Sequence, residues 1–168
     1  NDQWPVDVWI NDHIYILGDV SFGSTEETRK ILEKLKGHKH LIIGNHDKSC
    51  RGLENYFESI SQIKEFPIKK HQYDFLDETI YLVLCHFPMV AWNRRLHGAF
   101  MVHGHTHGSI DKINIDSGEL RVDIGLDSAF ADYGLVSHKK VYKYFKDYIK
   151  AQGFDNFEKY VEHKASVD

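Results

Sequence analysis

A strand–helix–strand pattern near the start of the chain constrains the fold most. The apolar run from His13 to Leu17 ends at Gly18 and predicts a buried strand. The residues Ser24 to Glu27 form a capping box that predicts the start of a helix, and Gly37 predicts its end. His40 to Ile43 predicts a second strand. Because a short strand, a helix and a short strand in succession form a right-handed crossover, we expect the two strands to be parallel.

The rest of the 168 residues continues the same alternation. Further strands are predicted at Ile63–Ile68, Lys69–Leu76, Thr79–Cys85, Phe100–Val102 and Leu120–Asp127. Helices are predicted at Gln3–Asn11, Leu53–Glu58 and Val141–Ala151. The sequence contains no linker, repeat or low-complexity segment that would divide it. We therefore expect residues 1–168 to form one α/β domain.

Composition excludes several classes of protein. The formal net charge of −4 argues against a binder of duplex nucleic acid. No apolar run is long enough for a membrane span, and no signal peptide opens the sequence. The two cysteines, Cys50 and Cys85, do not form a disulfide framework, so the expected location is cytoplasmic. The sequence leaves open whether the protein forms a homo-oligomer.

Polar side chains follow four of the predicted strands, at the point where each strand ends. They are Asp19, the stretch Gly44-Asn45-His46-Asp47, His86, and the loop Gly104-His105-Thr106-His107. Because the carboxyl ends of the strands form the ligand crevice of an open α/β sheet, we expect these groups to converge. Taken singly, each has a simpler explanation: a Gly-Asp turn, a buried core histidine, or a histidine-rich surface tract.

The donor types favour a pair of divalent metal ions. Asp19 can bridge two cations, Asn45 offers a neutral oxygen, and nitrogen ligands come from His86, His105 and His107. Mixed oxygen and nitrogen donors without thiolate suit Mn, Fe, Zn or Ni. Two such ions about 3.5–4 Å apart can polarise a phosphoryl oxygen and activate a bridging water as hydroxide.

Two neighbours of Asn45 are predicted to be catalytic residues. We assign His46 to the phosphate and the leaving-group oxygen, as general acid or stabiliser of transition-state charge. Asp47 is expected to orient the His46 imidazole.

Four further residues are candidates for supporting roles. Arg94 and Arg95 could bind the substrate phosphate with forked donors, although solvated loop charges are the simpler interpretation. Asp123 and Asp127 are interpreted as structural residues or as partners of the metal ligands.

This motif series, in order and spacing from Asp19 to His107, resembles that of the calcineurin-like metallophosphoesterases. The flanking chain is similar to small bacterial and phage members over nearly its full length. The resemblance implies an αββα sandwich of two mixed sheets flanked by helices and a dinuclear metal centre. It also implies metal-dependent hydrolysis of phosphomonoesters or phosphodiesters, with a phosphorylated small molecule or nucleotide as substrate. By position, Asp19 resembles the bridging carboxylate and His46 the catalytic histidine. The remaining family ligands of one metal are matched by Asn45, His86 and His105. His107 resembles a ligand of the other metal.

One family motif is absent. The family opens with Asp-x-His at the end of its first strand, and nothing before Asp19 fits that pattern, since Asp12-His13 is adjacent and precedes a strand. We therefore expect that the sequence is truncated at its N-terminus and lacks the first strand for that reason. A natural protein without this buried central strand would have two unpaired strand edges. The alternative is a non-catalytic scaffold or regulator with the phosphoesterase fold and at most one metal.

Overall fold

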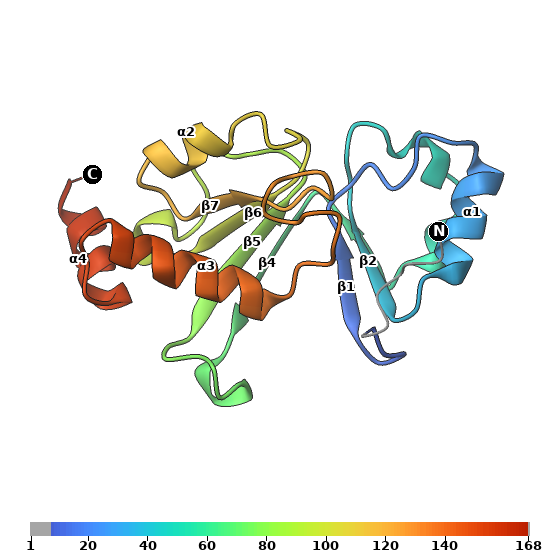
Figure 1. Cartoon of the computed structure of the whole chain (residues 1–168). Helices are drawn as coiled ribbons and strands as arrows, with labels where there is room; N and C mark the ends of the chain where they lie inside the picture. The colour runs from blue at the N-terminus through green and yellow to red at the C-terminus, as the bar shows by residue number, and fades with distance from the viewer. Residues whose placement is uncertain (1–7, 168) are drawn as a thin grey trace.

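The computed structural model describes residues 8–167, which form two sheets with flanking helices (Figure 1). The first sheet has the order β1-β2-β3, with β1 (His13–Ile16), β2 (His38–Ile42) and β3 (Ser59–Ser61). The second has the order β4-β5-β6-β7, with β4 (Ile63–Ile68), β5 (Ile80–Cys85), β6 (Phe100–His103) and β7 (Arg121–Asp123). The helices are α1 (Thr25–Lys34), α2 (Asp111–Asp116), α3 (His138–Ala151) and α4 (Phe157–Val167). None of the helices in the described range is both long and apolar enough to cross a membrane.

The predicted strand–helix–strand unit is confirmed. β1 and β2 are parallel, with His13 paired to His38, and α1 lies between them in the chain. The capping box forms as predicted: the Ser24 hydroxyl accepts from the Glu27 N–H (3.3 Å), and the Glu27 carboxylate accepts from the Ser24 N–H (2.8 Å).

Strand directions differ between the two sheets. All described strands of the first sheet are parallel, since β3 also runs parallel to β2. The second sheet is mixed, because β4 is antiparallel to β5 whereas β5, β6 and β7 are parallel. The prediction of two mixed sheets is therefore right for the second sheet and wrong for the first.

Alternating side chains divide the apolar residues between the two faces of each sheet. In β2, Leu41 packs with Leu32 of α1, whereas Ile42 points to the opposite face and joins the main core. That core also contains the buried face of the second sheet and α3, where the rings of Phe100 and Phe145 lie 4.6 Å apart. α3 runs across this face in Figure 1.

Aromatic rings connect the two sheets. Tyr15 of β1 stacks on His40 of β2 (4.6 Å between centroids) and on Phe66 of β4 (5.1 Å). His40 also shares a hydrogen bond with His13, from Nε2 to Nδ1 at 2.8 Å, and another with the Ser59 hydroxyl at 2.7 Å. Burial lowers the pKa of His40, and the neighbouring His13 lowers it further.

Several predicted elements are wrong. The predicted strand Lys69–Leu76 is a turn that contains a short 3-10 helix (Lys70–Gln72), because the Gln72 side chain accepts the Lys69 N–H and most of its residues are exposed. The predicted helix Leu53–Glu58 is a single 3-10 turn, Glu54–Tyr56. Of the predicted helix Gln3–Asn11, residues 3–7 lie outside the described residues, and the remainder forms a turn closed by a bond from the Asp12 N–H to the Trp9 carbonyl.

Other elements differ in extent or were not predicted. The strand predicted at Leu120–Asp127 stops at Asp123, because the Asp123 carboxylate accepts the Gly125 N–H (2.7 Å) and turns the chain. β3, α2 and α4 have no counterpart in the sequence-based prediction, since each is short or weakly patterned.

Candidate metal centre

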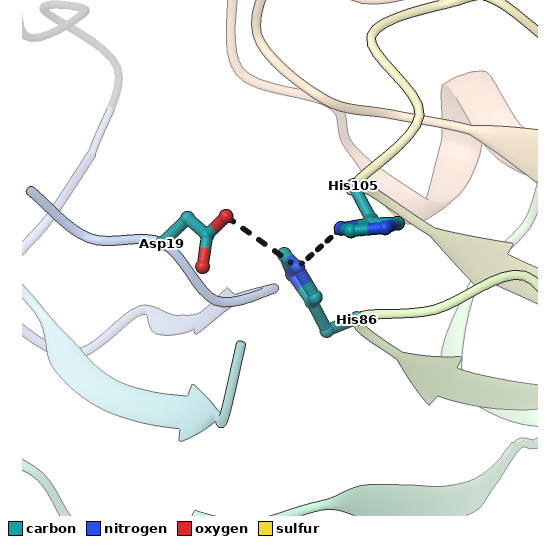
Figure 2. Close-up of side chains that lie close together, drawn as sticks. All are labelled: Asp19, His86 and His105. Carbon is teal, nitrogen blue, oxygen red and sulfur yellow. Dashed lines mark hydrogen bonds and ion pairs between the residues drawn. The ribbon is translucent and has the colours of Figure 1, made fainter. Parts of the chain in front are cut away.

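Four strand ends deliver the predicted ligands to one place. Asp19 and Asn45 follow β1 and β2 of the first sheet, and His86 and His105 follow β5 and β6 of the second. Asp19, His86 and His105 offer ligand atoms that all lie within 4.8 Å of one another. Figure 2 shows these three side chains turned toward a common point from opposite sides. The site therefore lies where the two sheets meet.

His86 is the central side chain of this group. Its Nε2 lies 2.9 Å from Asn45 Oδ1, 3.2 Å from His105 Nδ1 and 3.5 Å from Asp19 Oδ2. Its Nδ1 lies 2.6 Å from the carbonyl oxygen of Leu17. Because a carbonyl only accepts, Nδ1 carries the proton, and in the neutral ring Nε2 then presents a lone pair to the other groups. A donated Nδ1–H is also the usual arrangement of a metal-ligating histidine.

Two of the three groups that surround His86 Nε2 are acceptors, and the third, His105 Nδ1, donates or accepts according to its tautomer. The Asp19 carboxylate and the Asn45 carbonyl oxygen have no proton to offer to a neutral His86. Lone pairs that converge in a partly buried place repel one another unless a proton or a cation lies between them. His86 is 2% exposed, so bulk water screens this repulsion weakly. The residues present therefore fit a cation that accepts oxygen and nitrogen ligands.

Backbone geometry at the site leaves no room for larger residues. A Cβ on Gly18 would lie 2.5 Å from His86 Nδ1, and a Cβ on Gly44 would lie 2.7 Å from the Asp19 nitrogen. Asp19 and His105 themselves adopt left-handed φ values of 53° and 67°. Such conformations cost about 1–3 kcal/mol each in a non-glycine residue and cluster at functional sites.

His46 lies beside the cluster. Its backbone N–H donates to Asp19 Oδ1 (2.8 Å), which leaves Oδ2 as the oxygen nearest to His86. The side chain is exposed, and its ring contacts Phe22 at 5.1 Å between centroids. This position is compatible with the predicted catalytic role.

Asp47 has a different role from the one predicted. The sequence predicts that Asp47 orients the His46 imidazole. Its carboxylate instead accepts the Val20 N–H (2.8 Å) through Oδ1 and the Gly44 N–H (2.6 Å) through Oδ2. The two amides belong to the loops that carry Asp19 and Asn45. Asp47 therefore fixes these two loops relative to each other.

His107 is not part of the group that gathers around His86. Its Nδ1 bonds Asp127 Oδ2 at 2.6 Å, and its side chain is 63% exposed. The Asp127 carboxylate raises the pKa of His107 through this hydrogen bond. In the described structure the predicted second-metal ligand is therefore held by a carboxylate partner.

A buried carboxylate shapes the histidine loop. Asp123 is fully buried and accepts hydrogen bonds from the Thr106 hydroxyl and from the Gly108 N–H (3.1 Å). These bonds hold Thr106 and Gly108, the residues on either side of His107. Thr106 also follows His105 directly, so the same carboxylate holds the loop next to that proposed ligand. Asp123 is thus a supporting residue of the loop, one of the two roles that the sequence predicts for it.

The sequence did not predict the carbonyl oxygen of Leu17 as the partner of His86 Nδ1, because a backbone acceptor leaves no signal in the sequence.

The two arginines make structural contacts. The Arg94 guanidinium lies 3.9 Å from the ring centroid of Tyr81. Arg95 pairs with Glu119 at 2.7 Å, and Glu119 also binds Lys164 of α4 (2.6 Å). These contacts connect the loop after β5 to the C-terminal helix. The substrate-binding role of Arg94 and Arg95 stays a prediction.

Comparisons with known proteins place the chain near two phage proteins. No family model matches it. It is 29% identical to the Gene 66 protein of Mycobacterium phage D29 over 147 residues, which span 76% of this chain and 73% of the phage protein. It is 31% identical to the Gene 66 protein of Mycobacterium phage L5 over 127 residues, 62% of this chain and 60% of that protein.

One solved structure has the same fold. The protein of unknown function AQ665 from Aquifex aeolicus matches with a TM-score of 0.56 and 24% identity, over 82% of this chain and 78% of that one. At this identity the likeness shows the fold alone. An α/β architecture of two sheets with flanking helices is therefore shared by both proteins.

Proposed function

We propose that this protein is a metal-dependent phosphoesterase. The observation that carries the proposal is the convergence of Asp19, Asn45, His86 and His105 from four strand ends on one point. The motif series that resembles the calcineurin-like metallophosphoesterases runs through the same residues. We extend the proposal to the αββα arrangement of that family.

The proposed ligands have the chemistry that a divalent cation of the Mn, Fe, Zn or Ni type requires. One carboxylate oxygen, one amide oxygen and two imidazole nitrogens would hold it. When bound, such a cation supplies Lewis-acid polarisation of a phosphoryl oxygen and lowers the pKa of water so that it can attack phosphorus at neutral pH.

The chain's own residues would supply the remaining steps. The Leu17 carbonyl accepts the Nδ1 proton of His86 and would hold the orientation of this ring during turnover. Asp47 keeps the loops of Asp19 and Asn45 in register. The exposed ring of His46, whose backbone N–H donates to Asp19, would donate a proton to the leaving-group oxygen.

Activity with model phosphoesters tests the proposal. The full-length protein is incubated with an aryl phosphate and with a bis-aryl phosphodiester in the presence of Mn²⁺, Fe²⁺, Ni²⁺ or Zn²⁺, and hydrolysis is expected with at least one of them. Replacement His46→Ala should lower the rate by about 10²–10⁴-fold and leave metal content unchanged. Absence of turnover with all four metals would contradict the proposal.

A scaffold or regulator with the same fold is the second candidate. The observation that favours it is that His107, the residue predicted to serve a second metal, does not join Asp19, His86 and His105 in the part of the chain that the structure describes. Elemental analysis separates the two candidates. About two metals per chain support a dinuclear enzyme, whereas one or none, together with absent turnover, supports the scaffold.

A further inference from the structure

Two phenylalanine rings lie against the proposed metal centre. Phe22, in the loop between Asp19 and α1, is 74% exposed, and its ring contacts His46 at 5.1 Å and an interplanar angle of 51°. A benzyl group this exposed contributes little to the core. Because most of its apolar surface stays in water, this ring adds little to the free energy of folding.

Phe87 reaches the site from the other sheet. It follows His86 directly and is 43% exposed. Its ring meets His86 edge-on (4.8 Å, 86°) and His105 (4.6 Å, 63°). The two rings thus contact site residues from two different sheets. Single exposed apolar side chains need no explanation, but a pair in ring contact with the histidines of one site does.

We propose that Phe22 and Phe87 are specificity residues that bind a planar aromatic group of the substrate. The inference rests on the proposed function and narrows its substrate to phosphoesters that carry an aryl ring or a nucleobase. The cation and the imidazoles would bind the phosphoryl oxygens, and the phenylalanine rings would bind the plane attached to them. An aliphatic phosphoester lacks a face on which these rings can stack.

The expected size of the effect follows from aromatic stacking. A base stacked on an aromatic side chain contributes about 1–3 kcal/mol. At about 1.4 kcal/mol per tenfold in affinity, the lower limit corresponds to about a fivefold change in Kd.

Phosphonates of matched charge test this proposal at equilibrium, because they are not hydrolysed as esters. Isothermal calorimetry gives Kd for phenylphosphonate and for methylphosphonate with the Mn²⁺-loaded protein. We expect the phenyl compound to bind at least about fivefold more tightly. Phe22→Leu and Phe87→Leu, which keep an apolar side chain but remove the ring, should each reduce this ratio.

Two controls keep the outcome clear. Tyr73→Leu removes a half-exposed ring that packs against His138, and it should leave the ratio unchanged. Phe87 contacts two proposed ligands, so the Mn²⁺ content of Phe87→Leu is measured first. If that content falls, Phe22→Leu decides, since it alters no ring against His86 or His105.

The outcomes separate this inference from the proposed function. Equal affinity for the two phosphonates, or a ratio that neither leucine variant changes, overturns the inference even if phenyl phosphate is hydrolysed. A ring-dependent ratio in a protein that hydrolyses nothing supports the binding inference and contradicts the proposed function.

Discussion

The imidazole of His86 donates a hydrogen bond of 2.6 Å to the carbonyl oxygen of Leu17 and so ties the end of β5 to the end of β1. These strands belong to different sheets, and the two bonded residues lie 69 positions apart in the chain. The bond fixes the tautomer of His86 and directs Nε2 toward Asp19, Asn45 and His105. The geometry of the proposed metal site therefore depends on how the two sheets meet.

Mn²⁺ should stabilise the folded protein. At a free concentration of 100 times Kd, a ligand that binds only the folded state adds about 2.7 kcal/mol, which corresponds to about 5–10 °C in Tm for a domain of this size. Asp19→Asn should remove most of this shift, since it replaces the anionic ligand. Differential scanning calorimetry with and without Mn²⁺ measures it. The control Asp155→Asn, on an exposed ion pair with Lys159, should keep the full shift. A shift that survives Asp19→Asn would place the cation elsewhere.

Gly44→Ala should damage both stability and metal binding. The added Cβ would lie 2.7 Å from the Asp19 nitrogen and 2.9 Å from His86 Cε1, so one of the two residues must move. Overpacking of this kind costs about 1–3 kcal/mol in the free energy of unfolding. Urea denaturation and Mn²⁺ titration measure the two effects. Gly52→Ala is the control for a loss of stability alone: a Cβ is strained at its φ of 81°, but no atom lies within 4 Å of that Cβ, so Mn²⁺ affinity should not change.

Asp47→Asn should destabilise the protein by about 1–3 kcal/mol, because one oxygen that accepts a backbone N–H becomes an NH₂ group. The lost acceptor serves either Val20 or Gly44. Urea denaturation measures this change. Asp116→Asn, which breaks only an exposed pair with Lys112, should cost at most about 0.5 kcal/mol. An unchanged unfolding free energy would contradict the role of Asp47 in holding these two loops.

Stability should fall as the pH drops from about 7.5 to about 5.5, in part because of His40. Burial and the nearby His13 lower the pKa of His40 in the folded state, so the unfolded state binds a proton more readily. The contribution is complete above the unfolded pKa of about 6.5 and is lost as the pH falls toward the folded value. His38 and Lys64 act in the same direction, whereas Glu58 opposes them. His40→Gln should flatten the pH dependence, measured as urea-unfolding free energy at both pH values. An equally steep dependence in this variant would contradict the assignment.

The sequence predicts the strand–helix–strand unit and the gathering of the ligands well, but it predicts the turns poorly. The parallel strand–helix–strand unit depends on a capping box and two apolar runs, which are local signals. The strand predicted at Lys69–Leu76 is wrong, because the Lys69 N–H donates to the Gln72 side chain and this bond overrides strand propensity there. The convergence of the ligands could be predicted because side chains at the carboxyl ends of parallel strands lie at the same edge of the sheet.

The roles of individual side chains could not be predicted to the same extent. Asp47 follows His46 in sequence, yet its carboxylate turns back to the Val20 and Gly44 amides, and adjacency gives no sign of that. The partner of His107 is Asp127, which lies 20 residues away. The phenylalanine rings contact the site only after the two sheets have met.

Because the proposed ligands come from both sheets, a bound ion would cross-link the two sheets. Asn45 and His86 are separated by 41 residues, and an ion held by both would close that length of chain as a cross-link does. Closure of a long loop restricts the unfolded chain. Loading the site would therefore couple the unfolding of the two sheets, so that amide hydrogens in β2 and β5 exchange with solvent through a single opening event.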